Sequence, residues 1–501
     1  MAILEVLKTV NFGHRVAEEE GDQLSEYFVE TDHWTQLLGG NVDVVYGPKG
    51  SGKSALYSLL VARRTAFFDR QILLAPCENP RGAPAFRALA TDPPASETEF
   101  MALWKLYFAC LLSSSIKDYG IPGDDAERLH AALAESGLAT GQASLQKVLR
   151  SVYDYVKRIL RPAGFEVGAV LDPATHLPGV TAKILFSEPT ESQSKRGYKS
   201  VEELLRLGND ALASSGFKLW LLLDRLDVAF SESVELEVNA LRALFRTYLD
   251  LRPFDRLHMK IFLRTDIWKK ITSTGFREAS HVTRHITIEW SPASLMNLVI
   301  RRAAQNASLL EHYAVSREQV LASFDAQHKF FYRLFPSQVD VGPNKPETFD
   351  WMLSRVRDGT KQSAPRELIH LLNTLRDEEV RTLEVGRTAP EDGMVFSRVI
   401  FRDALLAVSR TRLEQTLYAE YPELKDKIEQ LRAEKTQHSI ASLAAIWRVD
   451  VSSAEAVARS LVDVGFFEQR GAKHAPVLWV PFLYRDALDM IQGSADEAAA
   501  G

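Results

Sequence analysis

Apolar positions along the chain fall into short runs that alternate with helical patterns. Residues 42–46, 72–75, 219–223 and 259–263 are mostly apolar, and runs of this length are typical of strands buried between two layers of helices. Between the second and third runs, residues 100–116 carry apolar side chains at helical spacing. This alternation predicts an α/β fold with a mostly parallel sheet.

The pattern also predicts how the chain divides. Residues 285–290 predict a further strand, followed by an amphipathic helix at 295–304. A Pro- and Gly-rich stretch at 161–199 predicts an insertion at about 120–200. We therefore expect a core at 1–290, a helical lid at 291–400, and a long helix with a further domain at 401–501.

Length and composition limit the class of protein. The chain has 501 residues, of which 46% are hydrophobic, enough for about three domains with large cores. A net charge of −6 argues against indiscriminate coating of nucleic acid. We find no apolar run of membrane-spanning length and no signal-sequence pattern, and so expect a cytoplasmic protein with no membrane partner. Cys77 and Cys110 are too few for a disulfide scaffold and predict buried thiols.

A glycine-rich segment follows the first apolar run. Residues 47–54 read GPKGSGKS, the P-loop spacing of a glycine, four residues and then Gly-Lys-Ser. Glycines let backbone N–H groups turn inward, and the helix that follows adds its positive N-terminal end, so the segment predicts a site for a nucleotide polyphosphate. The candidate nucleotide-binding residues here are Gly47, Pro48, Lys49, Gly50, Ser51, Gly52, Lys53, Ser54 and Ala55.

Side chains of two motifs have distinct predicted roles. Lys53 reaches the β- and γ-phosphates as a mobile cation, and the Ser54 hydroxyl is a ligand of Mg²⁺. The third apolar run ends in Asp224 and, three residues later, Asp227. Because a carboxylate at the end of a buried parallel strand lies beside the phosphate site, Asp224 is a second candidate Mg²⁺ ligand and Asp227 a candidate general base. The alternative is an acidic cap of the helix predicted at 234–248.

Arg264 is a candidate catalytic sensor of the γ-phosphate. It follows the strand predicted at 259–263, at the edge of the sheet where the phosphates lie. The alternative that stays open is a salt bridge from Arg264 to Asp266 or Asp224.

Taken together, these motifs resemble those of the AAA+ and STAND-class P-loop ATPases, and among them origin-recognition-like initiators and stand-alone bacterial ATPases. The resemblance covers most of the chain and implies bound ATP and Mg²⁺ and hydrolysis of ATP. It also implies that Pro365 and Arg366 form the sensor 2 element of the lid, with Arg366 directed to the phosphates, and that residues 11–13 line the adenine pocket. The residues that carry the resemblance are 12–13, 27–31, 47–54, 224–227, 262–266, 288–291, Leu295, Arg301 and 364–366.

Two features qualify the resemblance. AAA+ proteins have an acid directly after the Walker B Asp, whereas in this chain Arg225 follows Asp224 and the next acid is Asp227. This arrangement looks more like that of STAND ATPases and implies slow hydrolysis. An arginine finger is implied shortly before the last core strand, where Arg277 lies and Arg284 competes. A finger supplied by a second copy makes hydrolysis depend on assembly into a homo-oligomer.

The end of the chain predicts a winged helix at 438–484, with helical patterns at 439–447 and 452–464 and strands around a turn at 470–473. Its second helix has an acidic balance, and the basic side chains that favour phosphate contact lie on the wing. We therefore expect contact with a protein partner or with the rest of the chain rather than sequence-specific DNA binding. The residues concerned are Glu455, Arg459 and Asp463 on the helix and Arg470, Lys473 and His474 on the wing.

These features predict an ATP-dependent switch that controls a partner effector. Resembling bacterial proteins often act in anti-phage defence, which is the leading biological role. Two alternatives are a DNA-binding initiator or loader and a P-loop kinase of a small molecule. No catalytic motif of an effector stands out in the sequence, so we expect that activity in a partner chain.

Overall fold

A computed structural model describes residues 2–78, 89, 93–94, 96–138, 144–161, 183–226, 234–273, 275–390, 393–472 and 475–495. By their contacts, the residues fall into two compact units. We call residues 31–47 and 53–288 the sheet unit, and residues 1–30, 48–52 and 289–501 the helical unit.

The sheet unit is built on a five-stranded sheet in the order β2-β5-β6-β1-β7. All neighbouring strands are parallel, which confirms the predicted fold class of an α/β protein with a parallel sheet. The last strand is shorter than the predicted 285–290. The strands are β1 (Val44–Gly47), β2 (Ile72–Pro76), β5 (Lys218–Leu223), β6 (Leu257–Arg264) and β7 (His285–Thr287).

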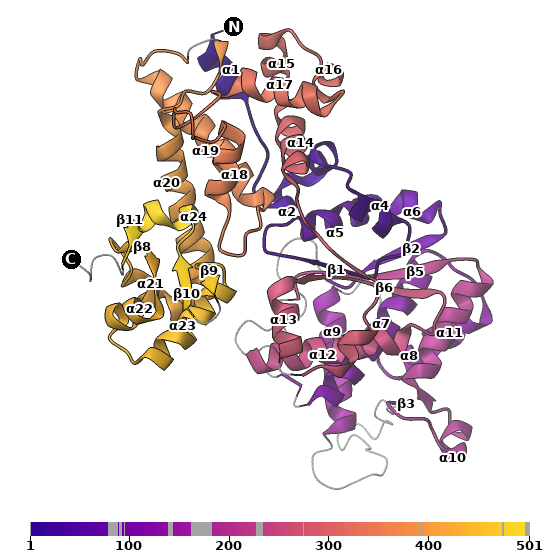
Figure 1. Cartoon of the computed structure of the whole chain (residues 1–501). Helices are drawn as coiled ribbons and strands as arrows, with labels where there is room; N and C mark the ends of the chain where they lie inside the picture. The colour runs from indigo at the N-terminus through magenta and orange to yellow at the C-terminus, as the bar shows by residue number, and fades with distance from the viewer. Residues whose placement is uncertain are drawn as a thin grey trace. The chain divides into compact units, whose positions relative to one another are not determined.

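Helices enclose this sheet. They are α4 (Asp32–Leu38), α5 (Lys53–Ala62), α6 (Arg64–Phe68), α7 (Glu97–Asp118), α11 (Val201–Ser214), α12 (Val234–Leu251), α13 (Thr265–Ser273) and the 3-10 turn η3 (Arg277–His281). Figure 1 shows α5 and α6 on one face of the sheet and α7 and α12 on the other. The Ser96 side chain caps α7 by accepting from the Glu99 N–H. Within the core, Trp104 Nε1 of α7 donates to the Ala240 carbonyl of α12 at 3.0 Å.

The predicted insertion contributes to the same core. Its described elements are α8 (Asp124–Glu135), α9 (Leu145–Leu160), β3 (Ile184–Leu185), α10 (Glu191–Lys195) and β4 (Lys199–Ser200). Apolar side chains of α8 and α9, among them Leu129 and Val152, are buried in one cluster with those of the sheet. Both cysteines, Cys77 and Cys110, are also buried there as free thiols, as predicted.

The helical unit joins both ends of the chain. Its first part contains α1 (Ile3–Thr9), α2 (Ala17–Glu20), η1 (Gly21–Gln23), α3 (Leu24–Tyr27), α14 (Pro292–Ala303), α15 (Ala307–Tyr313), α16 (Arg317–Leu321), α17 (Phe324–Leu334), α18 (Thr348–Val356) and α19 (Pro365–Glu384). The contacts therefore divide the chain differently from the predicted core at 1–290. Val6, Leu7 and Phe12 are buried against apolar side chains of α14 and α19, so the first 30 residues belong to the helical unit.

A long helix leads to the end of the chain. It begins as α20 (Ile400–Arg412), continues through a π-helical segment η5 (Leu413–Tyr418), and stops before Pro422, which starts a 3-10 turn. Residues 435–494 then form a four-stranded sheet in the order β11-β8-β10-β9, packed with two consecutive helices. The remaining elements are η6 (Pro422–Leu424), α21 (Lys425–Glu429), β8 (Lys435–His438), α22 (Ile440–Trp447), α23 (Val451–Asp463), β9 (Glu468–Ala472), β10 (Ala475–Trp479), α24 (Phe482–Arg485), η7 (Asp486–Leu488) and β11 (Ile491–Ser494).

Candidate nucleotide-binding site

The carboxyl edge of the five-stranded sheet carries several of the predicted residues of the sheet unit. Gly47 ends β1, and Arg264 ends β6 directly opposite it. Asp224 comes immediately after β5. Because β6 lies between β1 and β5, roughly 10 Å separates the P-loop strand from the strand of Asp224. This edge is where ligands bind in open parallel sheets.

Lys53 is held at this edge. It opens α5, close to the helix start predicted near Gly52. Its side chain is buried, and Nζ donates to the Gly47 carbonyl at 2.9 Å. Ser54 and Ala55 follow in the first turn, both half-buried. The first turn of α5 therefore offers an ammonium group, a hydroxyl and the positive end of a helix to one anionic ligand.

Asp224 is almost fully buried, with 4% of its surface exposed. Arg225 after it has a φ of 58°, the left-handed region that is uncommon for residues other than glycine. The chain therefore turns sharply as it leaves β5, and such backbone conformations concentrate at functional sites. Asp227 lies outside the described residues, so its role as general base stays a prediction.

Arg264 and Asp266 form a two-pronged ion pair. Nε of Arg264 donates to Oδ1 of Asp266 at 3.1 Å, and Nη2 donates to Oδ2 at 2.8 Å. Burial alone would raise the pKa of Asp266, but the charge and hydrogen bonds of Arg264, with a contribution from Lys53, hold that pKa below its ordinary value. The salt bridge that the sequence left open is therefore present, and sensing by Arg264 requires it to change partner or to act while paired.

The loop residues 48–52 belong to the helical unit. Gly50 and Gly52 have φ values of 80° and 100°, conformations that residues with a side chain rarely adopt. The Ser51 carbonyl accepts from Trp290 Nε1 at 2.9 Å, which fixes the middle of the loop. Ser51 Oγ is buried and has no hydrogen-bond partner among the described residues.

These residues fit a nucleotide with its metal ion. A buried hydroxyl without a partner, glycines in left-handed conformations and a buried lysine are the features that a polyphosphate would satisfy. The Ser54 hydroxyl and the Asp224 carboxylate are hard oxygen donors of the kind that Mg²⁺ takes, usually together with phosphate oxygens. Among the described residues, no group of three or more His, Cys, Asp or Glu side chains could hold a metal on its own.

Pro365 and Arg366, which the resemblance implies as a sensor 2 element, lie at the start of α19. Pro365 occupies the first helical turn, as predicted. A Cβ atom on Gly50 would lie 2.9 Å from Cβ of Arg366, so the loop passes directly against the helix start. Glycine at position 50 is thus required both by its φ and by this close approach.

A second contact to the loop was not foreseen from the sequence. Lys49 forms an ion pair with Glu420, which lies at the end of the long helix. Nearby, Arg412 pairs with Asp358 at 3.2 Å and with Glu367 at 2.8 Å. No local pattern marks these pairs, because the partners are far apart in the sequence.

A small cavity of about 100 Å³ lies beside these pairs, lined in part by Lys49, Arg366 and Arg412. His370 also lines it. Burial and the charge of Arg15 lower the pKa of His370 to about 4, so the imidazole is neutral at pH 7. The fixed positive charge around the cavity therefore comes from arginine and lysine side chains.

The two candidate arginine fingers differ in their surroundings. Arg284 is tied down within the sheet unit, with Nε 3.2 Å from Oδ2 of Asp43 and further bonds to the carbonyls of Gly40 and Asn41. Arg277 is exposed at the start of η3. An exposed side chain can reach another molecule, whereas one bonded within its own unit cannot. Arg277 therefore stays the candidate arginine finger.

Residues 11–13, implied to line an adenine pocket, are fixed within the helical unit. The Phe12 N–H donates to Asn373 Oδ1 at 3.2 Å, and Asn373 Nδ2 donates to the Gly13 carbonyl at 2.8 Å. The Asn11 N–H donates to Asn306 Oδ1 at 2.8 Å. This segment is therefore held by the start of α15 and by α19, and its adenine contact stays a prediction.

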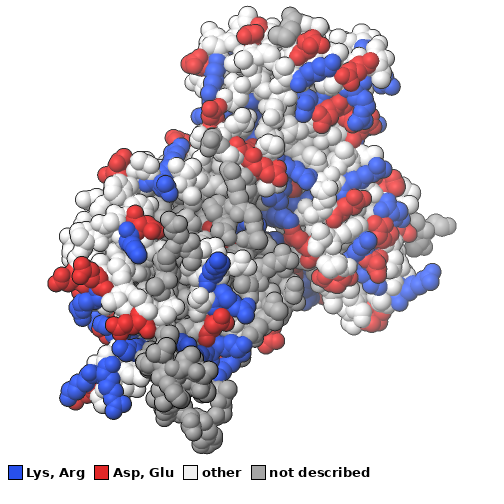
Figure 2. Space-filling view, turned by 180° about the vertical axis from the view of Figure 1, so that it is seen from behind, with Lys and Arg blue, Asp and Glu red and all other residues white. Residues whose placement is uncertain are grey.

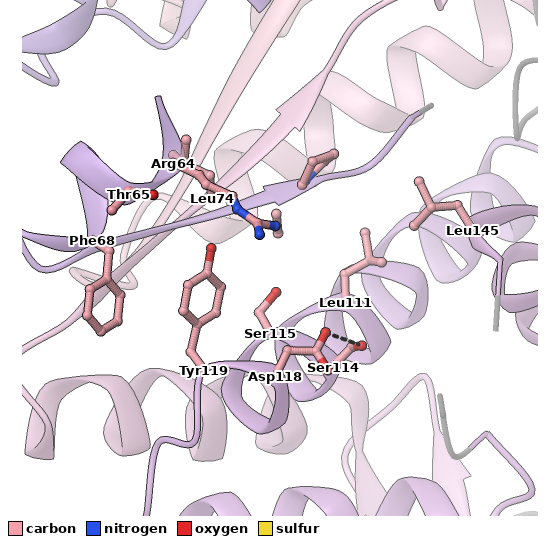
Figure 3. Close-up of a pocket in the computed structure, with 12 residues that line it drawn as sticks. Arg64, Thr65, Phe68, Leu74, Leu111, Ser114, Ser115, Asp118, Tyr119 and Leu145 are labelled. Carbon is pink, nitrogen blue, oxygen red and sulfur yellow. Dashed lines mark hydrogen bonds between the residues drawn. The ribbon is translucent and has the colours of Figure 1, made fainter. Parts of the chain in front are cut away.

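A larger cavity, of about 520 Å³, lies elsewhere in the sheet unit. Figure 3 shows Arg64, Thr65 and Phe68 on one side of it and residues of α7 on the other. None of the predicted site residues lines it.

In the part of the chain that the structure describes, no helix is long and apolar enough to cross a membrane.

No family model matches the chain, and no curated protein matches it. Among solved structures, the Aeropyrum pernix ORC2 protein, determined as ADPNP–ADP complexes, aligns over 91% of this chain and 90% of its own, with 13% identity and a TM-score of 0.31. At that level the two chains share neither close geometry nor close sequence. The parallel sheet itself is consistent with an α/β fold of the P-loop NTPase kind.

Proposed function

We propose that this chain binds ATP with Mg²⁺ at residues 47–54, hydrolyses it slowly, and uses the bound state as a switch. The supporting observation is the arrangement at the sheet edge, where buried Lys53 and buried Asp224 follow parallel strands of one sheet. Isothermal titration with ATP and phosphate release at the same protein concentration test it. No Mg²⁺-dependent binding at about 1 mM ATP would overturn the proposal.

Each residue of the proposed site has a chemical task. Ser54 and Asp224 hold Mg²⁺, which neutralises charge on the phosphates when bound. Lys53 binds the β- and γ-phosphates. Arg366, which lies against Gly50 of the loop, is a second proposed phosphate contact. Arg225 cannot accept a proton at the position directly after Asp224, which is the reason we expect slow hydrolysis.

The switch is proposed to act through Lys49. Because Lys49 lies inside the phosphate-binding loop and pairs with Glu420, a nucleotide that draws Lys49 to its phosphates weakens that pair. Glu420 lies at the end of the helix that carries the π-helical segment, and such segments are frequent at functional sites. The end of the long helix is thereby sensitive to the nucleotide.

Substitution of this pair tests the coupling. We expect ATP to change the hydrogen exchange of residues 413–429 in the wild type, and Lys49→Ala or Glu420→Gln to remove that response while ATP still binds. Glu423→Gln, at an exposed acid nearby, is the control and should respond like the wild type. An unchanged response in both pair variants would contradict the proposed coupling.

We propose a protein partner for the C-terminal region. On α23, Arg459 pairs with Glu455 at 3.0 Å. On the hairpin, Arg470 pairs with Glu468 at 2.7 Å and stacks on Trp479, whereas Lys473 and His474 lie outside the described residues. Figure 2 shows Lys and Arg interspersed with Asp and Glu over most of the face in view. Basic groups already paired with acids offer little to phosphates.

The initiator alternative is distinguished by DNA binding. An initiator or loader binds duplex DNA with an affinity that falls steeply as salt rises. A protein-directed switch shows no such binding at about 0.15 M salt. Control of an effector in anti-phage defence stays a prediction from the resemblance.

Substitution of Arg277 tests whether ATP hydrolysis depends on a homo-oligomer. If Arg277 reaches the nucleotide of a second copy, ATPase activity per chain rises with protein concentration, because a finger supplied in trans acts only in the oligomer. Arg277→Ala should flatten that dependence without changing ATP affinity. Turnover that does not vary with concentration in a strictly monomeric protein would exclude this role.

A further inference from the structure

Glu78 is a fully buried acid at the sheet edge that carries Asp224, with 0% of its surface exposed. In the pairing of β2 with β5, Pro76 lies opposite Leu222. The Cys77 N–H then donates to the Leu222 carbonyl at 2.8 Å, so the pairing extends beyond β2. Continued to the next residues, this register sets Glu78 opposite Asp224, about 5 Å away between backbones.

The P-loop helix holds Glu78 in place. Tyr57 Oη donates to the Glu78 carbonyl at 2.6 Å. Tyr57 lies one turn after Lys53 on α5, and residues four apart share one face of a helix. From α7, Tyr107 Oη donates to the Cys77 carbonyl at 2.8 Å. The chain end of β2 is therefore fixed against the helix face that presents Lys53.

The Tyr57 hydroxyl also responds to both acids. Burial raises the pKa of Tyr57, and the charges of Cys77, Asp224 and Glu78 raise it further. The Tyr57 hydroxyl therefore stays protonated and remains a donor to the Glu78 carbonyl. Burying a carboxylate is costly, and such groups concentrate at functional sites.

We propose that Glu78 is the catalytic base of ATP hydrolysis, an inference that rests on the proposed ATPase function. In this step the oxygen of a water molecule bonds to the γ-phosphorus, and the bond from that phosphorus to the β–γ bridging oxygen breaks. ADP leaves with the electron pair, and the proton of the water passes to the Glu78 carboxylate before it is released to solvent. Asp224 keeps its task at the metal ion.

The test compares Glu78→Gln with Asp227→Asn in the full chain. Glutamine keeps the shape of the side chain but cannot accept the proton. We expect kcat to fall by about 10²- to 10⁴-fold in Glu78→Gln, with the Kd for ATP within about threefold of the wild type. Glu237→Gln is the matched control, since Glu237 is a buried acid of the same unit that pairs with Lys270 at 2.8 Å. It should leave kcat unchanged.

Each result decides the inference. A wild-type rate in Glu78→Gln, or a loss of rate confined to Asp227→Asn, overturns it while the ATPase function stands. A wild type that binds no ATP, or binds it without turnover, overturns the proposed function and this inference with it. If Glu78→Gln does not fold, Glu78→Asp is the substitute test. Aspartate keeps the carboxylate but has a side chain shorter by one methylene, so the carboxylate no longer reaches the water. A reduced kcat with retained binding supports the role, and a full rate overturns it.

Discussion

Lys53→Ala is expected to abolish ATP binding at micromolar ATP. The Lys53 ammonium group is buried at the sheet edge, where it donates to the Gly47 carbonyl. Charge-assisted hydrogen bonds to phosphate are each worth roughly 1.5–3 kcal/mol. Loss of a lysine that serves two phosphates should therefore raise the Kd by about two to three orders of magnitude. Isothermal titration with Mg²⁺ and ATP measures the change.

The control for this prediction is Lys269→Ala, which removes an exposed lysine from α13 of the same unit. Its Kd should match that of the wild type. Circular dichroism and thermal unfolding confirm that both variants are folded. A folded Lys53→Ala variant with unchanged affinity would contradict the assignment of residues 47–54 as the phosphate site.

Of the variants proposed here, Arg412→Met is expected to lose the most thermal stability. The Arg412 guanidinium group is largely buried between Asp358 and Glu367. Methionine removes the positive charge and leaves both carboxylates without a cationic partner. Breaking a buried ion pair by removing one partner costs about 3–5 kcal/mol of folding free energy. For a unit of this size, the corresponding drop in Tm is about 10 °C. Differential scanning calorimetry measures it.

The destabilisation should also depend on pH. Burial already raises the pKa of Asp358, although the charge of Arg412 opposes the shift. Without the arginine that pKa rises further, and a carboxyl pKa raised in the folded state favours folding at low pH. The variant should therefore regain stability relative to the wild type as the pH falls from 7 toward about 5. A Tm within 2 °C of the wild type at pH 7 would contradict the role of Arg412.

The triple variant Arg412→Met, Asp358→Asn, Glu367→Gln separates burial of charge from packing. It removes the two carboxylates along with the arginine. If uncompensated charge causes the loss, the triple variant is more stable than Arg412→Met alone, because replacing a whole buried ionic group costs less than breaking it. Equal stability of the two variants would assign the loss to packing of the arginine stem.

The sequence by itself determined the local elements of this protein. Continuous apolar runs specified the strands at 72–75, 219–223 and 259–263 to within two residues at either end, because a strand covered on both faces needs apolar side chains throughout. The glycine spacing specified the loop that follows β1, since left-handed conformations at Gly50 and Gly52 favour glycine. A proline in the first turn likewise specified the start of α19.

Only the tertiary structure decided which residues meet. It placed β6 between β1 and β5, paired Arg264 with Asp266, joined Lys49 to Glu420, and buried Glu78 just beyond the end of β2. It also moved the first 30 residues into the helical unit. The physical reason is that apolar periodicity and backbone preference act over a few neighbouring residues. Strand order, ion pairing and burial of a single acid are instead set by packing between segments far apart in the chain.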